Sequence, residues 1–202
     1  MKDEELEVKY IVSDLNGIRQ NLERLNALLV QERVLEVNLR FDTEENLLAR
    51  QFRVLRLRYD TIARLTYKGP ALNQDGVRLR KEIEFEVSDF SAARSLLEAL
   101  DYRVAMIYEK YRQAYVIREV EISLDELPYG TFVELEGPST GRIREVNSLL
   151  KLDWDKRIDE SYAALFERLR IENGLKFRDL IFENFVGLKI EPGDMGIQPA
   201  DC

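Results

Sequence analysis

The chain alternates between charged and apolar residues over long stretches, so that side chains of one kind recur at every second position. A period of two is typical of a β-strand that buries one face in an apolar core. In the first such stretch, Glu5, Glu7 and Lys9 share one face, and Leu6 and Val8 share the other. Neighbouring charges on that face lie about 7 Å apart. This spacing suits a divalent metal ion beside a phosphate group, although a solvated strand face has the same pattern.

The same alternation predicts further strands at residues 34–41, 52–59, 62–68, 77–87, 104–112, 115–125 and 131–136. Along residues 77–87, five charged side chains in succession share one face, namely Arg78, Arg80, Glu82, Glu84 and Glu86. The pair Gly69-Pro70 is expected to end one strand, and residues 71–76 to form a polar loop after it. The sequence thus predicts about eight strands, each charged on one face.

Apolar residues at three- and four-residue spacing predict four helices. The first covers residues 15–29 after a cap at Ser13 or Asp14, and the second covers residues 90–100 after Ser88-Asp89. The third lies at residues 143–150, and the fourth, at 162–169, ends near Gly174. Residues 175–202 are expected to be a helix packed on the body followed by a disordered end, with a partner-binding segment as the alternative.

The chain of 202 residues has no internal linker, which predicts one domain, residues 1–174, and a partly disordered C-terminal extension, residues 175–202. Its shares of 45% apolar and 34% charged residues are those of a soluble globular protein. No apolar run approaches the length of about 18 residues that a membrane span needs, and the N-terminal stretch is too acidic for a signal peptide. We therefore expect a cytoplasmic monomer or homodimer without a membrane partner.

The absence of some residue types excludes several kinds of catalytic and metal-binding site. The chain has no histidine and a single cysteine, Cys202, which excludes zinc triads, histidine bases and internal disulfides. Any metal ion must then be held by oxygen. The net charge of -8 argues against a nucleic-acid partner, although it permits a local basic cluster.

Strands with one charged and one apolar face can pack in two ways. An open sheet would turn its charges to water, whereas a closed barrel would hold them in its interior and bury its outer apolar face under helices. The residue types favour the barrel, because among the cations of this face arginine, which grips phosphate oxygens in a bidentate way, outnumbers lysine. Acids on the first and last strands and bases on those between suggest a metal pole and a phosphate pole. The predicted fold is therefore α+β, an eight-stranded antiparallel β-barrel with a charged lumen.

Several motifs resemble those of the CYTH superfamily, also called triphosphate tunnel metalloenzymes. They run in order from Glu5-x-Glu7-x-Lys9 through Asn38-x-x-Phe41-Asp42-Thr43, Leu55-Arg56-Leu57-Arg58, Leu65-Thr66-Tyr67-Lys68-Gly69-Pro70, Arg80-x-Glu82-x-Glu84, Lys110-x-Arg112-x-x-Tyr115 and Asp125-x-x-x-x-Gly130-x-Phe132-x-Glu134-x-Glu136. The resemblance implies a barrel that forms a tunnel, Mg²⁺ or Mn²⁺ as the cofactor, and a small molecule that carries a triphosphate as the substrate.

The resemblance and the charge pattern together assign candidate roles. The phosphate-binding residues would be Arg56, Arg58, Lys68, Arg78, Arg80, Lys110 and Arg112, and the metal ligands Glu5, Glu7, Glu82, Glu84, Asp125, Glu134 and Glu136. Asp125 has the alternative role of orienting an arginine. The catalytic candidates are Lys9, Glu5 and Glu7, and water could be activated by a carboxylate, by a lysine of lowered pKa such as Lys9, or by the metal ion.

The superfamily divides by reaction, and these motifs are shared among its branches. We expect metal-dependent hydrolysis of inorganic tripolyphosphate or thiamine triphosphate, because the bases suffice to grip a triphosphate and no residues can be assigned to a nucleoside. The first alternative is a type IV adenylyl cyclase that converts ATP to cyclic AMP and pyrophosphate. The second is a non-catalytic module that binds polyphosphate or a nucleotide.

Overall fold

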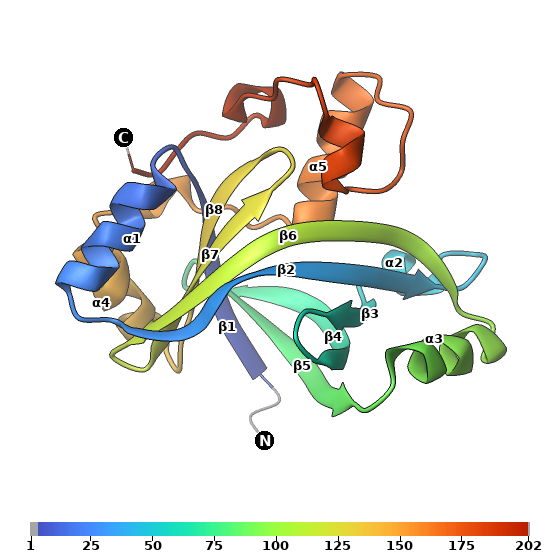
Figure 1. The fold of residues 1–202 in the computed structure, drawn as a ribbon. Coiled ribbons are helices and arrows are strands. Elements are labelled where there is room, and N and C mark those ends of the chain that lie inside the picture. Colours follow the sequence, from blue (N-terminus) through green and yellow to red (C-terminus); the bar gives the residue numbers. More distant parts are fainter. Residues whose placement is uncertain (1–3, 202) are drawn as a thin grey trace.

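A computed structural model describes residues 4–201 of the chain, which therefore excludes Cys202. Eight antiparallel strands form a closed barrel in the order β1-β5-β4-β3-β2-β6-β7-β8 (Figure 1). Their bounds are β1 Glu4–Val12, β2 Leu28–Asp42, β3 Val54–Tyr59, β4 Ala63–Gln74, β5 Val77–Val87, β6 Arg103–Ile117, β7 Val120–Leu127 and β8 Gly130–Glu136. The predicted fold class is confirmed.

The strand order places the first strand, β1, directly beside the last strand, β8. Strand β1 pairs with β5 on one side and with β8 on the other, with Glu7 opposite Glu136 and Lys9 opposite Glu134. Because side chains alternate across a strand, the predicted charged face of each strand turns to the interior and most apolar residues turn outward. The acidic first and last strands therefore form one continuous wall.

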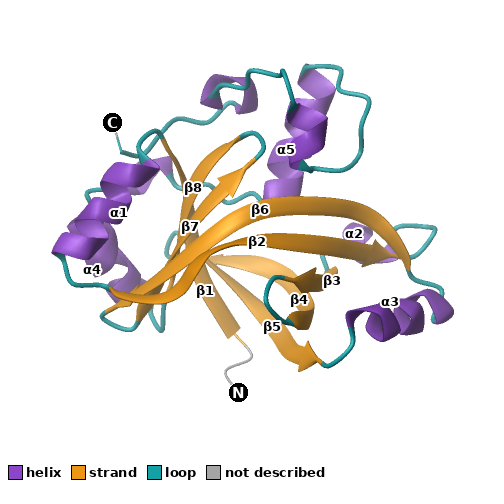
Figure 2. Cartoon of the chain, in the orientation of Figure 1, coloured by secondary structure: helices purple, strands orange, loops and turns teal. Residues whose placement is uncertain are grey.

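Three helices cover parts of the outer apolar face (Figure 2). Helix α1 (Leu15–Arg24), capped by Asp14, and helix α4 (Thr140–Leu150) pack over β1, β7 and β8, with Leu22 and Val146 fully buried between them and the barrel. Helix α3 (Phe90–Ala99) packs over β2 and β3 through Leu97. A single short turn, α2 (Leu47–Arg50), follows β2.

Helix α5 (Tyr162–Glu172) has a different position, at one end of the barrel. Tyr162 lies edge-on against Phe132, with ring centroids 5.0 Å apart, and belongs to the same cluster as Ile11 and Leu165. Ile11 shares a strand face with Lys9, and Phe132 shares one with Glu134, so the helix packs against inward-facing residues. Helix α5 therefore covers this end of the lumen.

Three predicted boundaries were wrong. Leu28 and Leu29 begin β2 and do not extend helix α1, which ends at Arg24. Strand β4 continues through Gly69 and Pro70 to Gln74, because a register shift between Lys68 and Ala71 absorbs the proline and lets pairing with β5 resume. Strand β6 extends to Ile117, past the break expected at residues 113–114, so the strand predicted over 115–125 is divided between β6 and β7.

The C-terminal segment is packed in the structure, which corrects the expectation of a helix with a disordered end. Strand β7 pairs only with residues 111–117 of β6, and the backbone of Leu180 bonds to Ile107 and Glu109 on the part of β6 that β7 leaves free. Leu180 and Met195 are fully buried beside α5. Residues 175–201 form two 3₁₀ turns, Phe182–Phe185 and Pro192–Met195, and no α-helix.

Candidate functional site

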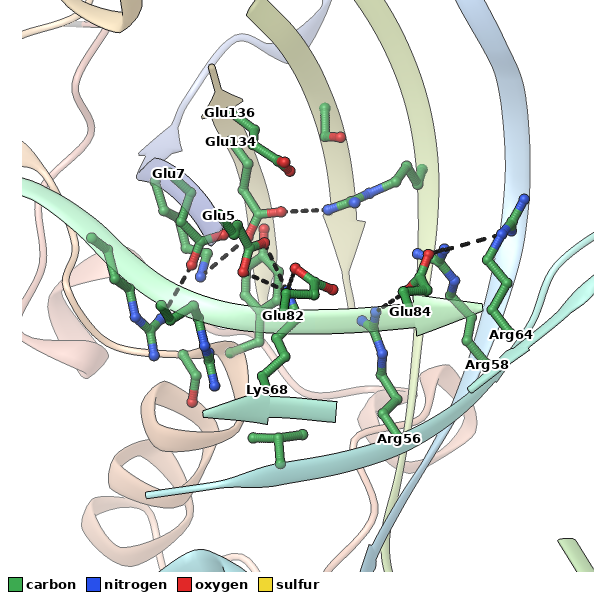
Figure 3. A pocket seen from close by; sticks show the side chains of 18 of the residues that line it. Glu5, Glu7, Arg56, Arg58, Arg64, Lys68, Glu82, Glu84, Glu134 and Glu136 are labelled. Carbon is green, nitrogen blue, oxygen red and sulfur yellow. Dashed lines mark hydrogen bonds and ion pairs between the residues drawn. The ribbon is translucent and has the colours of Figure 1, made fainter. Parts of the chain in front are cut away.

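The barrel encloses a cavity of about 530 Å³ whose walls are mostly charged (Figure 3). Every residue that the sequence assigned to the site lines this cavity except Asp125. Residues from all the strands contribute, because each strand turns its charged face inward. No helix among residues 4–201 is long and apolar enough to cross a membrane.

Four carboxylates on β1 and β8, namely Glu5, Glu7, Glu134 and Glu136, form what we call the acidic wall. Burial raises the pKa of Glu136 to about 8, and repulsion from Glu5 adds to the effect. Burial and repulsion from Glu5 likewise raise the pKa of Glu7. Burial is the largest cause of both shifts, whereas at Glu134 the cations Lys9 and Arg112 outweigh burial and hold the pKa well below its usual value.

Four cations on β3 and β6, namely Arg56, Arg58, Lys110 and Arg112, form the basic wall. Arg56 and Arg58 both bind Glu84, at 3.2 and 3.1 Å, and Arg112 binds both Glu134 and Asp125. Lys68, on β4, binds the acidic wall, because its Nζ is 2.7 Å from Glu5, and it also binds Glu82 at 3.0 Å. Arg78 and Arg80 lie on β5, where Arg78 binds Glu7 at 3.3 Å and Arg80 donates to the carbonyl oxygen of Gly69.

Lys9 is almost fully buried among groups that stabilise an ammonium ion. Its Nζ is 3.2 Å from Glu134, donates to the carbonyl oxygen of Glu160 and lies 4.2 Å from the ring centroid of Tyr162. A carboxylate, a carbonyl and an aromatic face all attract a cation. These three contacts hold the Lys9 side chain at the acidic wall of the cavity.

Asp125 is completely buried and does not reach the cavity. Its carboxylate accepts hydrogen bonds from Lys110 Nζ at 2.9 Å, Arg112 Nε at 2.7 Å and the hydroxyl of Tyr162 at 2.8 Å. Its oxygens are thus used to hold two cations of the basic wall. These contacts favour the alternative prediction, that Asp125 orients an arginine, over its role as a metal ligand.

The other predicted metal ligands fall into two groups. Glu84 lies with Arg56, Arg58 and Arg64, apart from the acidic wall (Figure 3). Burial alone would raise its pKa, but Arg58 and Arg56 hold it below its usual value. Its place on the basic side speaks against a metal-binding role. Glu82 is bound to Lys68, which also binds the acidic wall.

The donor set of the acidic wall fits a hard divalent cation. Carboxylate oxygens are the ligands that Mg²⁺ and Mn²⁺ prefer, and crowded carboxylates with raised pKa values gain from a cation between them. Within residues 4–201, however, no three acidic side chains are grouped closely enough to hold one ion. Glu5 and Glu134 instead bind Lys68, Lys9 and Arg112.

The structure adds residues that the sequence did not assign. Glu36 is fully buried, 3.5 Å from both Arg58 and Lys110; burial alone would raise its pKa, but Lys110, Arg112 and Arg58 lower it to about 2. Arg40 lines the cavity from the same strand face. The alternation of residues 34–41 already placed both on the charged face. Tyr162 gave no such signal, because it belongs to the apolar stripe of a helix.

An eight-stranded antiparallel barrel around a lumen of opposed acidic and basic walls defines a tunnel protein built to bind a highly charged ligand. The model of the CYTH domain matches residues 3–164, and the chain belongs to the CYTH family. Members of this family act on triphosphates, as adenylyl cyclases or triphosphatases, and generally depend on a divalent metal ion.

Relatives carry both activities in their names. The chain is 29% identical over 176 residues to a protein of Methanocaldococcus jannaschii named "putative adenylate cyclase", covering 80% of this chain and 97% of the relative. A Vibrio parahaemolyticus structure with the same description superposes with a TM-score of 0.74 at 22% identity, over 83% of this chain and 99% of the other. A Hippeastrum structure, described as a "putative adenylyl cyclase" with a dominant triphosphatase activity, has a TM-score of 0.62 at 21% identity, over 81% and 95%.

Proposed function

We propose that the chain is a divalent-metal-dependent hydrolase that splits a triphosphate inside its tunnel, with inorganic tripolyphosphate as the favoured substrate and thiamine triphosphate as the other candidate. A triphosphate carries about four negative charges, so breaking its phosphoanhydride bond requires charge neutralisation and in-line positioning. The basic wall, together with Lys68, Arg78 and Arg80, supplies that charge.

The observation that carries the proposal is the composition of the cavity wall. Its apolar lining comprises Val54, Ile83 and Ala163, and its two tyrosines, Tyr108 and Tyr162, donate or accept hydrogen bonds with Arg56 and Asp125. Sites that hold an aromatic base are usually lined by apolar and aromatic groups. A tunnel with so few of them is better suited to a ligand held by its phosphates.

In this proposal each wall has its own role. The carboxylates Glu5, Glu7, Glu134 and Glu136 would bind Mg²⁺ or Mn²⁺, which supplies Lewis acidity toward the phosphate oxygens when bound. Lys9 lies at the acidic wall and would stabilise charge on the reacting phosphoryl group, since Glu134 and Tyr162 hold its ammonium group at the cavity. The basic wall would hold the substrate, while buried Asp125 and Glu36 fix its cations.

The test is chemical. Purified protein is given tripolyphosphate, thiamine triphosphate and ATP separately, each with Mg²⁺ or Mn²⁺, and the products are identified as orthophosphate, pyrophosphate or cyclic AMP. We expect orthophosphate from tripolyphosphate or thiamine triphosphate. Cyclic AMP with stoichiometric pyrophosphate from ATP, together with inertness toward the other two, would replace the hydrolase by the cyclase that the relatives' names suggest.

A further inference from the structure

Arg40 on β2 is a tunnel arginine whose charge is not paired. It lines the cavity, yet within residues 4–201 its guanidinium group makes neither a hydrogen bond nor an ion pair. The arginines of the basic wall differ, because Arg56 and Arg58 bind Glu84 and Arg112 binds Asp125. Arg40 is therefore available to an anion that enters the tunnel.

The carboxylates of Asp42 and Glu84 make their hydrogen bonds to other groups. Asp42, two residues further along β2, accepts hydrogen bonds from the backbone N–H groups of Thr43, Leu48 and Ala49 at 2.8 to 2.9 Å. These bonds fix the loop after the strand. Glu84 accepts from Arg56, Arg58 and the hydroxyl of Thr66, and neither carboxylate forms an ion pair with Arg40.

The neighbour of Arg40 on the next strand is another cation. Arg40 lies directly opposite Arg56 in the pairing of β2 with β3. Burial lowers the pKa of Arg40 and outweighs the attraction of Tyr108 and Asp42, while repulsion from Arg56 adds a smaller contribution in the same direction as burial. An arginine nevertheless keeps its charge in proteins. A confined charge without a partner lowers the stability of the fold, and a bound anion would remove this cost.

We propose that Arg40 and Arg56 form a phosphate-binding subsite of the tunnel, in which Arg40 is kept unpaired for one phosphate group of the substrate. Arg56 is already oriented by Tyr108 and Thr66, each 3.2 Å away. Two neighbouring guanidinium groups suit the several oxygens of a phosphate. This inference rests on the proposed function and adds a residue to it.

The place of the subsite in the barrel indicates which phosphate it holds. Strands β2 and β3 lie across the ring of strands from β1 and β8, which carry the acidic wall. A phosphate at Arg40 is therefore the one on the side of the lumen away from the carboxylates. Arg40 then helps to set how many phosphates the tunnel holds at once.

The test is calorimetric binding of tripolyphosphate, and of ATP as a second source of the triphosphate group, to the wild type and to Arg40→Met, in EDTA and with Mg²⁺. We expect Arg40→Met to raise the Kd about tenfold or more for whichever ligand the wild type binds, because a hydrogen-bonded charge contact is lost. The melting temperature of the unliganded variant should equal or exceed that of the wild type, since an unpaired charge is removed. Arg40→Lys, which keeps the charge, should retain part of the affinity.

Arg64→Met is the matched control, because Arg64 lines the same cavity but binds Asp60 at 2.9 Å. Its melting temperature should fall, since Asp60 loses the nearer of its two cations and keeps only Arg58 at 3.8 Å. Wild-type affinity in Arg40→Met, or a fall in melting temperature as large as that of Arg64→Met, would overturn the inference. If the wild type binds neither ligand in either condition, the proposed function itself fails, and the subsite with it.

Discussion

Glu136 differs from the other carboxylates of the acidic wall, because no cation among residues 4–201 forms an ion pair with it. Removing its charge therefore leaves no lysine or arginine unpaired. We expect Glu136→Gln to weaken Mn²⁺ binding by at least about tenfold, the loss typical even of residues that only support a metal ligand. Metal titration followed by calorimetry measures this directly.

The stability of Glu136→Gln tests the charge of Glu136 independently of metal binding. The folded pKa of about 8 lies above the ordinary value of 4.5, so ionised Glu136 lowers the stability of the wild type increasingly as the pH rises through this window. Above pH 8, metal-free Glu136→Gln should be at least as stable as the wild type. Glu134→Gln is the contrast, because it removes the carboxylate that pairs with Lys9 and one of the two that pair with Arg112, and it should melt earlier. Equal metal affinity in both variants and the wild type would contradict the metal assignment.

Glu36 has the opposite electrostatic situation. Its folded pKa of about 2 lies below the ordinary 4.5, so its ionised form stabilises the fold above pH 4.5, and this contribution is lost as the pH falls through 4.5 toward 2. The shift corresponds to roughly 3 kcal/mol. Glu36→Gln should therefore be clearly less stable than the wild type at pH 7, and the difference should shrink in acid.

Denaturant unfolding of the wild type and Glu36→Gln across this pH range checks the effect. The control is Glu126→Gln, which breaks an exposed ion pair with Arg33 and should change stability by less than about 1 kcal/mol at any pH. A gap between Glu36→Gln and the wild type that stays constant down to pH 2 would show that the charge of Glu36 is not what stabilises the basic wall.

At the scale of elements, helix α5 connects the end of the barrel to the basic wall. The hydroxyl of Tyr162 donates to Asp125, which holds Lys110 and Arg112, and the ring lies beneath Lys9. Tyr162→Phe removes the hydroxyl but keeps the ring. We expect the KM for the triphosphate to rise several-fold, because Asp125, which orients two cations of the basic wall, loses one hydrogen bond. The kcat should change little, because the ring that contacts Lys9 is kept.

Tyr129→Phe is the matched control for this variant. The Tyr129 hydroxyl also makes one buried hydrogen bond in the same cluster, at 2.9 Å, but to the backbone oxygen of Tyr162. Both variants should lose similar thermal stability, about 1 kcal/mol each for one buried hydrogen bond. A rise in KM shared equally by the two would mean that Tyr162 acts only through packing.

The alternation of charged and apolar residues predicted the β-strands, because a strand has a period of two that is visible in its own sequence. It found the eight strands and the inward set from Glu5 to Glu136, because a closed barrel imposes its inside and outside on every second residue. The alternation did not predict the structure of segments whose conformation depends on contacts with residues far away in the sequence. Leu28 and Leu29 fit a helical stripe but pair with Val116 and Tyr115, and Leu180 is ordered by an unpaired strand edge that no local pattern reveals.

The same limit applies to the site. Asp125 shares its alternation with metal-ligand candidates, yet the two cations next to it on β6 and the hydroxyl from α5 occupy its oxygens. Arg40 and Glu36 were on the predicted charged face, but only the pairing of β2 with β3 and β6 shows which of them has a partner. Ion-pair partners depend on strand register, which the sequence of one strand does not contain.

At the scale of the whole molecule, an acidic chain of net charge -8 encloses a cavity in which bases face acids. The outer charge repels a triphosphate at long range, whereas the lumen attracts it at short range, where salt screens less. Turnover should therefore require a divalent cation that offsets the negative charge of the acidic wall.

The most direct test of the central claim incubates tripolyphosphate with the wild-type protein and Mg²⁺ in water labelled with ¹⁸O, with and without excess chelator. Phosphorus NMR then identifies the products and their ¹⁸O content. The proposed function predicts equal amounts of orthophosphate and pyrophosphate, one ¹⁸O atom incorporated per bond broken, and no products once the metal is chelated. Turnover that persists undiminished under chelation, or an intact tripolyphosphate beside an ATP sample converted to cyclic AMP, would contradict it.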